Sequence, residues 1–116
     1  MSVRPETAYK VLTTPQMAEL LELGSFAGAL IDLVDGYVHL STAVQLTETV
    51  DKHFAGQVDL FVAAVDLSRL GDAVRWEESR GGQLFPHIYA PLPLSAVTAH
   101  GLLQRDGDGS VLLPGA

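Results

Sequence analysis

The sequence contains no cysteine among its 116 residues. Disulfide bridges, thiolate metal sites and cysteine nucleophiles are therefore excluded, and the reducing cytoplasm is the expected location. Basic residues are also scarce, since seven Lys and Arg face fourteen Asp and Glu and give a formal net charge of −7. Such a chain repels a phosphate backbone, so nucleic acid is not an expected partner.

Long apolar runs are missing as well. The longest run without glycine covers only residues 60–65, and the first ten residues contain no apolar segment of the kind that a secretory signal needs. We therefore expect neither a signal peptide nor a membrane span, and no membrane partner. The length and a hydrophobic content of 47% indicate one ordinary packed domain over residues 1–116, and they give no indication of its oligomeric state.

Two segments have the features of helices. Thr13 followed by Pro15 predicts a helix over residues 15–23, which ends at Gly24. Thr42 followed by Gln45 is a capping-box pattern and predicts a second helix that ends before residue 56. The stretch between them, residues 25–35, lacks clean periodicity and is either a packed functional loop or partly helical.

About six short strands are expected around these two main helices, in a small split sheet of antiparallel or mixed type. The strand-like segments cover residues 8–13, 37–41, 60–66, 73–77, 97–103 and 111–113. The segment 85–91 contains two prolines, which fits an edge strand or an arm that crosses the domain. A turn signal at residues 106–109 predicts a C-terminal hairpin over residues 97–113. The fold class is therefore α+β.

The stretch from Gly36 to Thr42 is the main candidate site. Alternation along a strand places Tyr37, His39 and Ser41 on one face. Thr42 starts the next helix, whose positive end lies where an anion or a polar ligand could be held. No metal-ligand spacing, nucleophile elbow or phosphate loop occurs in the sequence, so no metal site is expected.

Two further positions are candidates. His87, like His39, lies inside an apolar strand-like segment where a half-buried imidazole needs a partner, and both a functional and a structural histidine fit that pattern. Trp76 and Glu77 either place a ring and a carboxylate in a pocket or form a core tryptophan beside a solvated acid.

The order of these features resembles a bacterial family known as domain of unknown function 952, over residues 7–103. The residues that carry the resemblance are Tyr9-Lys10, Asp35 to Thr42 with Gln45, Asp59-Leu60 with a strand ending in Asp66, Trp76-Glu77, Phe85 to Tyr89, and Pro91-Leu92. The resemblance implies a fold similar to the ADP-ribosyltransferase superfamily, whose active members hold nicotinamide adenine dinucleotide (NAD) in a cleft. His39-Leu40-Ser41 is similar to the His-Gly-Thr or His-Gly-Ser strand of that superfamily.

This resemblance also implies roles for the candidate residues. His39 and Ser41 would orient a ribose, and Tyr37, Trp76 or Tyr89 would stack on nicotinamide, with Thr42 beside them. Glu77 or His87 would handle charge or a proton, so that His39, His87 and Glu77 form the catalytic set. The superfamily's transferases supply a glutamate from a late strand, whereas this chain has no glutamate after Glu78.

Two classes of function remain open at this point. In the first, the domain binds a small polar or nucleotide-like ligand, with NAD or ADP-ribose as the type, and carries out transferase or glycohydrolase chemistry in which NAD is a substrate. In the second, it is a non-enzymatic module for small ligands or protein interaction, and the histidines are structural. Exposure and hydrogen bonding of His39 and His87 distinguish the two classes.

Overall fold

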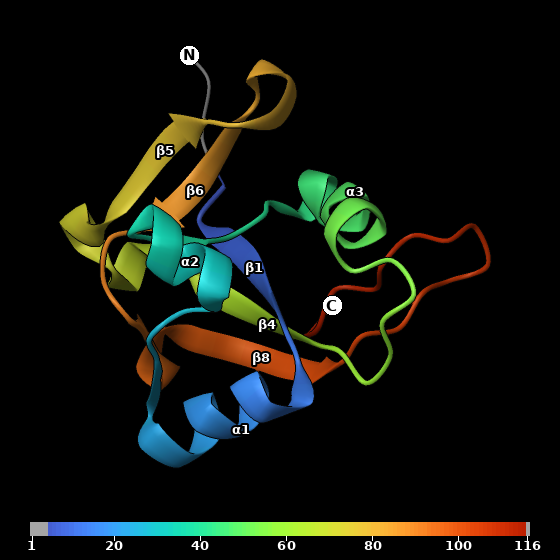
Figure 1. Ribbon diagram of the computed structural model, residues 1–116, viewed down its shortest axis with the longest axis horizontal. Helices are drawn as coiled ribbons and strands as arrows, with labels where there is room; N and C mark the ends of the chain where they lie inside the picture. The colour runs from blue at the N-terminus through green and yellow to red at the C-terminus, as the bar shows by residue number, and fades with distance from the viewer. Residues whose placement is uncertain (1–4, 116) are drawn as a thin grey trace.

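The computed structural model describes residues 5–115, except the side chain of residue 80; residues 1–4 and 116, which the domain and signal-peptide predictions include, lie outside the described residues. Its helices are α1 (Thr14–Leu23), α2 (Leu30–Asp35) and α3 (Ala43–His53) (Figure 1). Its strands are β1 (Thr7–Leu12), β2 (Ser25–Phe26), β3 (Val38–His39), β4 (Phe61–Asp66), β5 (Val74–Glu78), β6 (Leu84–Ile88), β7 (Leu92–Pro93) and β8 (Val97–Leu102).

Local signals in the sequence set the ends of the two longer helices. The Thr13 side chain accepts a hydrogen bond from the Gln16 amide at the start of α1, and Gly24 ends that helix with a left-handed φ of 74°. The Thr42 side chain likewise accepts from the Gln45 amide at the start of α3. Both predicted helices are confirmed, with bounds that differ by a few residues at most.

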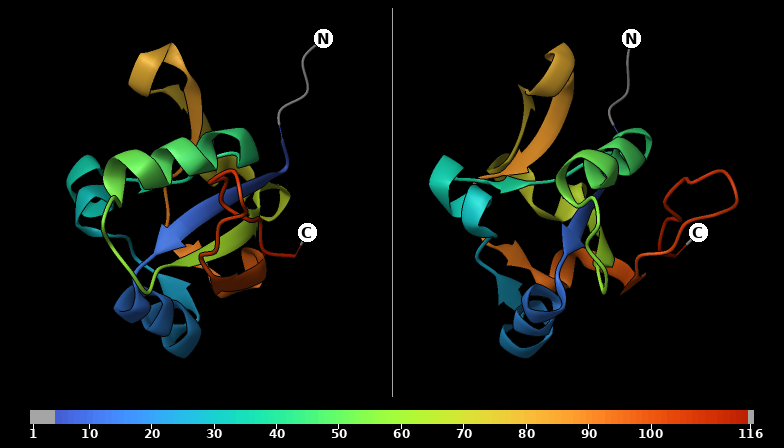
Figure 2. Two further views of the ribbon diagram at one scale, coloured as in Figure 1. Left: turned by 90° about the vertical axis from the view of Figure 1, so that its right-hand side faces the viewer. Right: turned by 45° about the vertical axis from the view of Figure 1, so that its right-hand side comes forward.

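The strands form three antiparallel sheets, so the α+β class is confirmed. Their orders are β1-β4-β8, β3-β6-β5 and β2-β7. The first sheet is covered on both faces, with α3 and α1 on opposite sides (Figures 1 and 2). Leu46 and Val50 of α3 pack against one face, whereas Met17 and Leu20 of α1 pack against the other. The sheet therefore separates two apolar clusters.

The stretch 25–35 is partly helical, and this corrects the expectation of two main helices to three. Ser25–Phe26 pairs with β7, and α2 follows it before the chain reaches β3. Strand β3 is shorter than expected because the chain leaves its sheet at Leu40. Ser41 instead exchanges two backbone hydrogen bonds with Tyr9 of β1, at 2.7 and 2.9 Å. One short segment therefore links two sheets.

The expectation of an edge strand or arm at residues 85–91 was wrong. Strand β6 is the central strand of its sheet and pairs with both β3 and β5. The Pro86 carbonyl accepts a hydrogen bond from the Leu40 amide at 3.1 Å, just beyond the end of β3. The N–H and C=O of one residue face the same neighbouring strand, so the N–H that proline lacks would also face Leu40. Pro86 is therefore accommodated because β3 has already ended at that position.

Near the C-terminus, β8 pairs with β4 rather than with the residues that follow it. The expected hairpin is limited to a bridge between Arg105 and Val111 around a turn at Asp106. None of the helices over residues 5–115 combines the length and the apolar character that a membrane crossing requires.

Candidate functional site

His39 and His87 face the same side of the sheet β3-β6-β5. They are directly opposed across β3 and β6, and their ring centroids lie 5.2 Å apart. Directly opposed residues project from one face of a sheet, whereas Val38 and Ile88, one position along, are buried in the core on the other face. The register of two short strands therefore brings together histidines that are far apart in the sequence.

Asp32 of α2 is the buried carboxylate behind His39. Only 1% of its surface is exposed, and it accepts hydrogen bonds from Lys10 Nζ at 2.9 Å, from His39 Nδ1 at 2.6 Å and from the Ala29 amide at 2.7 Å. Burial raises the pKa of Asp32, but the hydrogen bonds from His39 and Lys10 and the Lys10 charge outweigh it and lower this pKa to about 2. The carboxylate is therefore ionised at neutral pH.

The His39 ring lies between two carboxylates. Its Nε2 is 3.0 Å from Asp35 Oδ2, while its Nδ1 contacts Asp32. A neutral imidazole has a single N–H, so both contacts are ion pairs only when the ring is doubly protonated. With 30% of its side chain exposed, His39 is accessible from solvent.

His87 is buried and holds a second carboxylate. Its Nδ1 lies 2.8 Å from Glu77 Oε1, and the same oxygen accepts from the Tyr89 hydroxyl at 2.7 Å. Hydrogen bonds from His87 and Tyr89 lower the pKa of Glu77, whereas burial lowers the pKa of His87. Tyr37 stacks on the His87 ring at 4.1 Å. His87 therefore orients Glu77 from within the protein.

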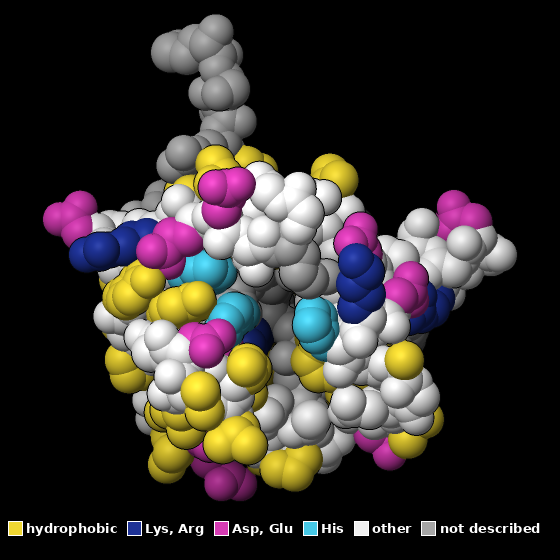
Figure 3. Space-filling view, turned by 45° about the horizontal axis from the view of Figure 1, so that its top comes forward, with side chains coloured by type: hydrophobic (Ala, Val, Ile, Leu, Met, Phe, Trp, Pro, Cys, Tyr) yellow, Lys and Arg dark blue, Asp and Glu magenta, His cyan; other side chains and the backbone are white. Residues whose placement is uncertain are grey.

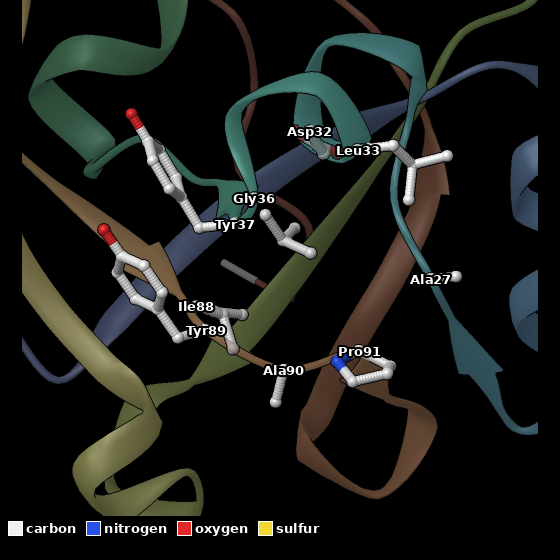
Figure 4. Close-up of a pocket in the computed structure, with 10 residues that line it drawn as sticks. Ala27, Asp32, Leu33, Gly36, Tyr37, Ile88, Tyr89, Ala90 and Pro91 are labelled. Carbon is white, nitrogen blue, oxygen red and sulfur yellow. The ribbon is translucent and has the colours of Figure 1, made fainter.

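A cleft of about 240 Å³ adjoins these groups. It lies between α2 and the residues that follow β6, with Asp32, Leu33, Tyr37, Tyr89 and Pro91 among its lining (Figure 4). The two tyrosine rings lie side by side with centroids 5.1 Å apart, and their hydroxyl ends point away from the apolar end of the cleft. The Tyr89 hydroxyl donates to Glu77, so that carboxylate lies beyond the hydroxyl ends of the rings and is not among the residues that line the cleft.

The surface over this region combines several kinds of side chain. Two histidine side chains lie next to each other among acidic and hydrophobic ones, beside a hollow in the surface (Figure 3). The Arg75 guanidinium carbon lies 4.9 Å from the centroid of the Tyr89 ring, which is the geometry of a cation–π contact. Within residues 5–115 no group of three or more His, Asp or Glu side chains is arranged to hold a metal ion.

Three of the residues expected at the site lie elsewhere. The Ser41 hydroxyl is hydrogen-bonded to Thr49 of α3 at 2.8 Å. Thr42 is buried and caps α3. Trp76 projects from the face of β5 opposite to Glu77 and packs against the apolar core. The structure therefore brings together Tyr37, His39, Glu77, His87 and Tyr89, and it does not bring Ser41, Thr42 or Trp76 to them.

Four charged residues at the site were not predicted as site residues from the sequence, although two of them belong to motifs that carry the family resemblance: Lys10, Asp32, Asp35 and Arg75. Lys10 could have been noticed, because a lysine between apolar residues in a buried strand needs a counter-charge. Asp32 had no such signal, since it lies in the stretch without periodicity and its partner Lys10 is 22 positions away.

Comparisons with known proteins agree with this fold. The family described as Protein of unknown function (DUF952) matches residues 11–100. The crystal structure of protein CC0527 from Caulobacter crescentus is similar at 42% identity and a TM-score of 0.83, over 92% of this chain and 94% of that chain. Its solution NMR structure is similar at 41% identity and a TM-score of 0.77, over 92% and 91%. No curated protein matches the chain.

Proposed function

The chain belongs to the DUF952 family, and we propose that the cleft beside Tyr37 and Tyr89 binds a small polar ligand of the nucleotide type, with NAD or ADP-ribose as its model. The observation that carries this proposal is a cleft lined by Tyr37, Tyr89 and the Asp32 carboxylate. His39 and Glu77 lie next to these lining residues, since the His39 ring is 4.7 Å from that of Tyr37 and Glu77 accepts a hydrogen bond from the Tyr89 hydroxyl. Its ligand class comes from the resemblance to the ADP-ribosyltransferase superfamily.

The geometry supports different roles for the tyrosine rings and the two histidines. The rings of Tyr37 and Tyr89 offer flat surfaces for a nicotinamide or a base, and the accessible His39 ring offers hydrogen bonds to ribose hydroxyls. His87 is only 2% exposed, so its part is to position Glu77 rather than to touch the ligand.

Glu77 supplies the negative charge that transferase or glycohydrolase chemistry needs. When the glycosidic C–N bond of NAD breaks, nicotinamide leaves with the bonding electron pair and positive charge develops on the ribose. A carboxylate held ionised by hydrogen bonds stabilises that charge. Water or another hydroxyl nucleophile then bonds to the same ribose carbon and releases its proton to solvent. In this proposal Glu77 takes the place of the late-strand glutamate that the chain lacks.

Calorimetric titration with NAD, ADP-ribose and nicotinamide tests binding. We expect the wild-type protein to bind at least one of them, and Tyr37→Ala to weaken the affinity by about tenfold, because one stacking surface is lost. Val44→Ala is the matched control, since Val44 is 94% exposed on α3 and is not among the residues that line the cleft. If the wild type binds none of the three at millimolar concentration, the nucleotide proposal is abandoned.

A chromatographic assay for nicotinamide separates chemistry from binding. Nicotinamide released by the wild type and lost with Glu77→Gln supports the proposed reaction. Binding without release leaves a binding module and removes the enzymatic part of the proposal.

The burial of His87 favours one competing function, a non-enzymatic module with structural histidines. In that case His39→Ala and His87→Ala each lower the free energy of unfolding by about 2 kcal/mol, because each removes one hydrogen-bond donor from a carboxylate. For a ligand site, we expect a clear loss only for His87→Ala, since His39 is partly solvated. Urea denaturation of the two variants distinguishes these patterns.

A further inference from the structure

Helix α2 buries an acidic side chain and exposes its apolar ones, which is the reverse of an ordinary surface helix. Its acid Asp32 is 1% exposed, whereas its four large apolar side chains face solvent. Their exposed fractions are 79% for Leu30, 58% for Ile31, 62% for Leu33 and 72% for Val34. A helix at the surface of a soluble domain usually buries such residues and exposes its charges.

The orientation of α2 is fixed by its buried acid. Rotating the helix to bury its apolar face would remove Asp32 from Lys10 and His39 and leave a buried charge without a partner. Gly28 adds to this restraint, because a Cβ atom there would lie 2.8 Å from Asp32 Cβ. The fold therefore leaves these four apolar side chains in water, although burying them would be favourable.

The surroundings of this apolar face are acidic. Asp35 ends the same helix with 36% of its side chain exposed. Glu77, also 36% exposed, accepts a hydrogen bond from Tyr89, which lines the same cleft as Leu33. Hydrophobic side chains gather next to acidic ones on this side of the molecule (Figure 3). The apolar face thus continues through Leu33 into the cleft, and the carboxylates of Asp35 and Glu77 lie next to residues that line it.

We propose that the exposed face of α2, formed by Leu30, Ile31, Leu33 and Val34, is a docking surface for a protein segment in which apolar side chains are flanked by Lys or Arg. Apolar contacts would cover the helix, and the cations would meet Asp35 and Glu77. Charge complementarity selects this occupant. A second copy of the chain would bring the same acidic rim and a further net charge of −7 against it, and anionic lipid would be repelled.

Binding of a defined probe tests the docking surface. The probe is a capped amphipathic peptide of about 14 residues made of Leu and Lys, followed by fluorescence anisotropy. We expect Leu30→Ser with Val34→Ser to weaken binding by about tenfold. The control pair, Val44→Ser with Val58→Ser, removes side chains that are 94% and 79% exposed elsewhere and should bind as the wild type does.

Comparison peptides and further assays identify which kind of partner binds this surface. A peptide with Glu in place of Lys, and one with Ser in place of Leu, should both bind much more weakly. The proposal is overturned if both variant pairs lose the same amount of peptide affinity. It is also overturned if the Glu peptide binds the wild type as tightly as the Lys peptide does. Sedimentation that shows a dimer dissolved by the α2 variants assigns the face to a second copy, and binding to phosphatidylcholine vesicles assigns it to a membrane; either result also overturns it.

This inference stands apart from the nucleotide proposal. Leu30 and Val34 do not line the cleft, so their substitution should leave the titrations with NAD and ADP-ribose unchanged. Loss of peptide binding with intact nucleotide binding supports the docking surface alone, and the reverse result supports the cleft alone.

Discussion

The two faces of strand β1 are both buried, yet they are stabilised by different interactions. On one face, Tyr9 and Val11 pack against the apolar side of α3. On the other, Ala8 and Leu12 join the apolar core, while Lys10 between them is paired with Asp32. The apolar face depends on area removed from water, and the charged face depends on one matched pair that carries a desolvation cost.

The candidate site therefore lies on the charged face, where stability depends strongly on one side chain. Apolar contacts are numerous and individually weak, so losing one leaves the others in place. The Asp32 carboxylate, in contrast, holds α2, Lys10 and His39 together. The following predictions break or sharpen this comparison, beginning with the largest effect.

Asp32→Ala should lower the free energy of unfolding by about 3–5 kcal/mol, because it leaves Lys10 buried without a counter-charge. Urea denaturation monitored by circular dichroism measures the loss. The double variant Lys10→Met with Asp32→Leu should lose less than Asp32→Ala alone, since no unpaired charge then remains. A double variant that is the less stable of the two would contradict the stated cause.

Leu46→Ala on α3 should cost about 2–4 kcal/mol, because it opens a cavity under a side chain that is 1% exposed. The same denaturation experiment, repeated between pH 5 and pH 8, measures this loss. We expect it to be independent of pH and salt, unlike losses at the charged face. If the loss caused by Leu46→Ala depended strongly on salt concentration, charged groups would also contribute to the stability of this face.

The pKa of Asp32 predicts an acid-sensitive part of the stability. Since the folded pKa is about 2 and the unfolded value is near 4, the contribution is present above about pH 4 and is lost as the pH falls through 2. The stability difference between wild type and Asp32→Asn should shrink by about 2 kcal/mol between pH 5 and pH 2. A constant difference across this range would contradict the ionised pair.

Thr42→Ala should have the smallest effect, about 1 kcal/mol, because it removes only the side-chain cap of α3. Thermal unfolding measures the change. Val44→Ala, in the first turn of the same helix, is the control and should be almost neutral. If Thr42→Ala also abolished ligand binding, the predicted role of Thr42 beside the ligand would be supported over a purely structural one.

Local patterns in the sequence predicted a large part of this fold. The caps at Thr13 and Thr42 act within three residues, and the continuous apolar run that predicts β4 is a property of neighbouring residues. The two site histidines, His39 and His87, were also identifiable, because an imidazole inside an apolar strand requires a partner. Which groups would supply those partners was not encoded in any short stretch.

The sequence by itself thus determined the starts of α1 and α3, the lack of thiol chemistry and the acidic net charge. Tertiary structure alone decided that β6 is central, that α2 turns its acid inward, and that Asp32 meets Lys10 across 22 positions. The physical reason is the separation along the sequence over which each interaction acts. Caps and periodicity act between near neighbours, whereas an ion pair and a strand register exist only after distant segments have been packed against each other.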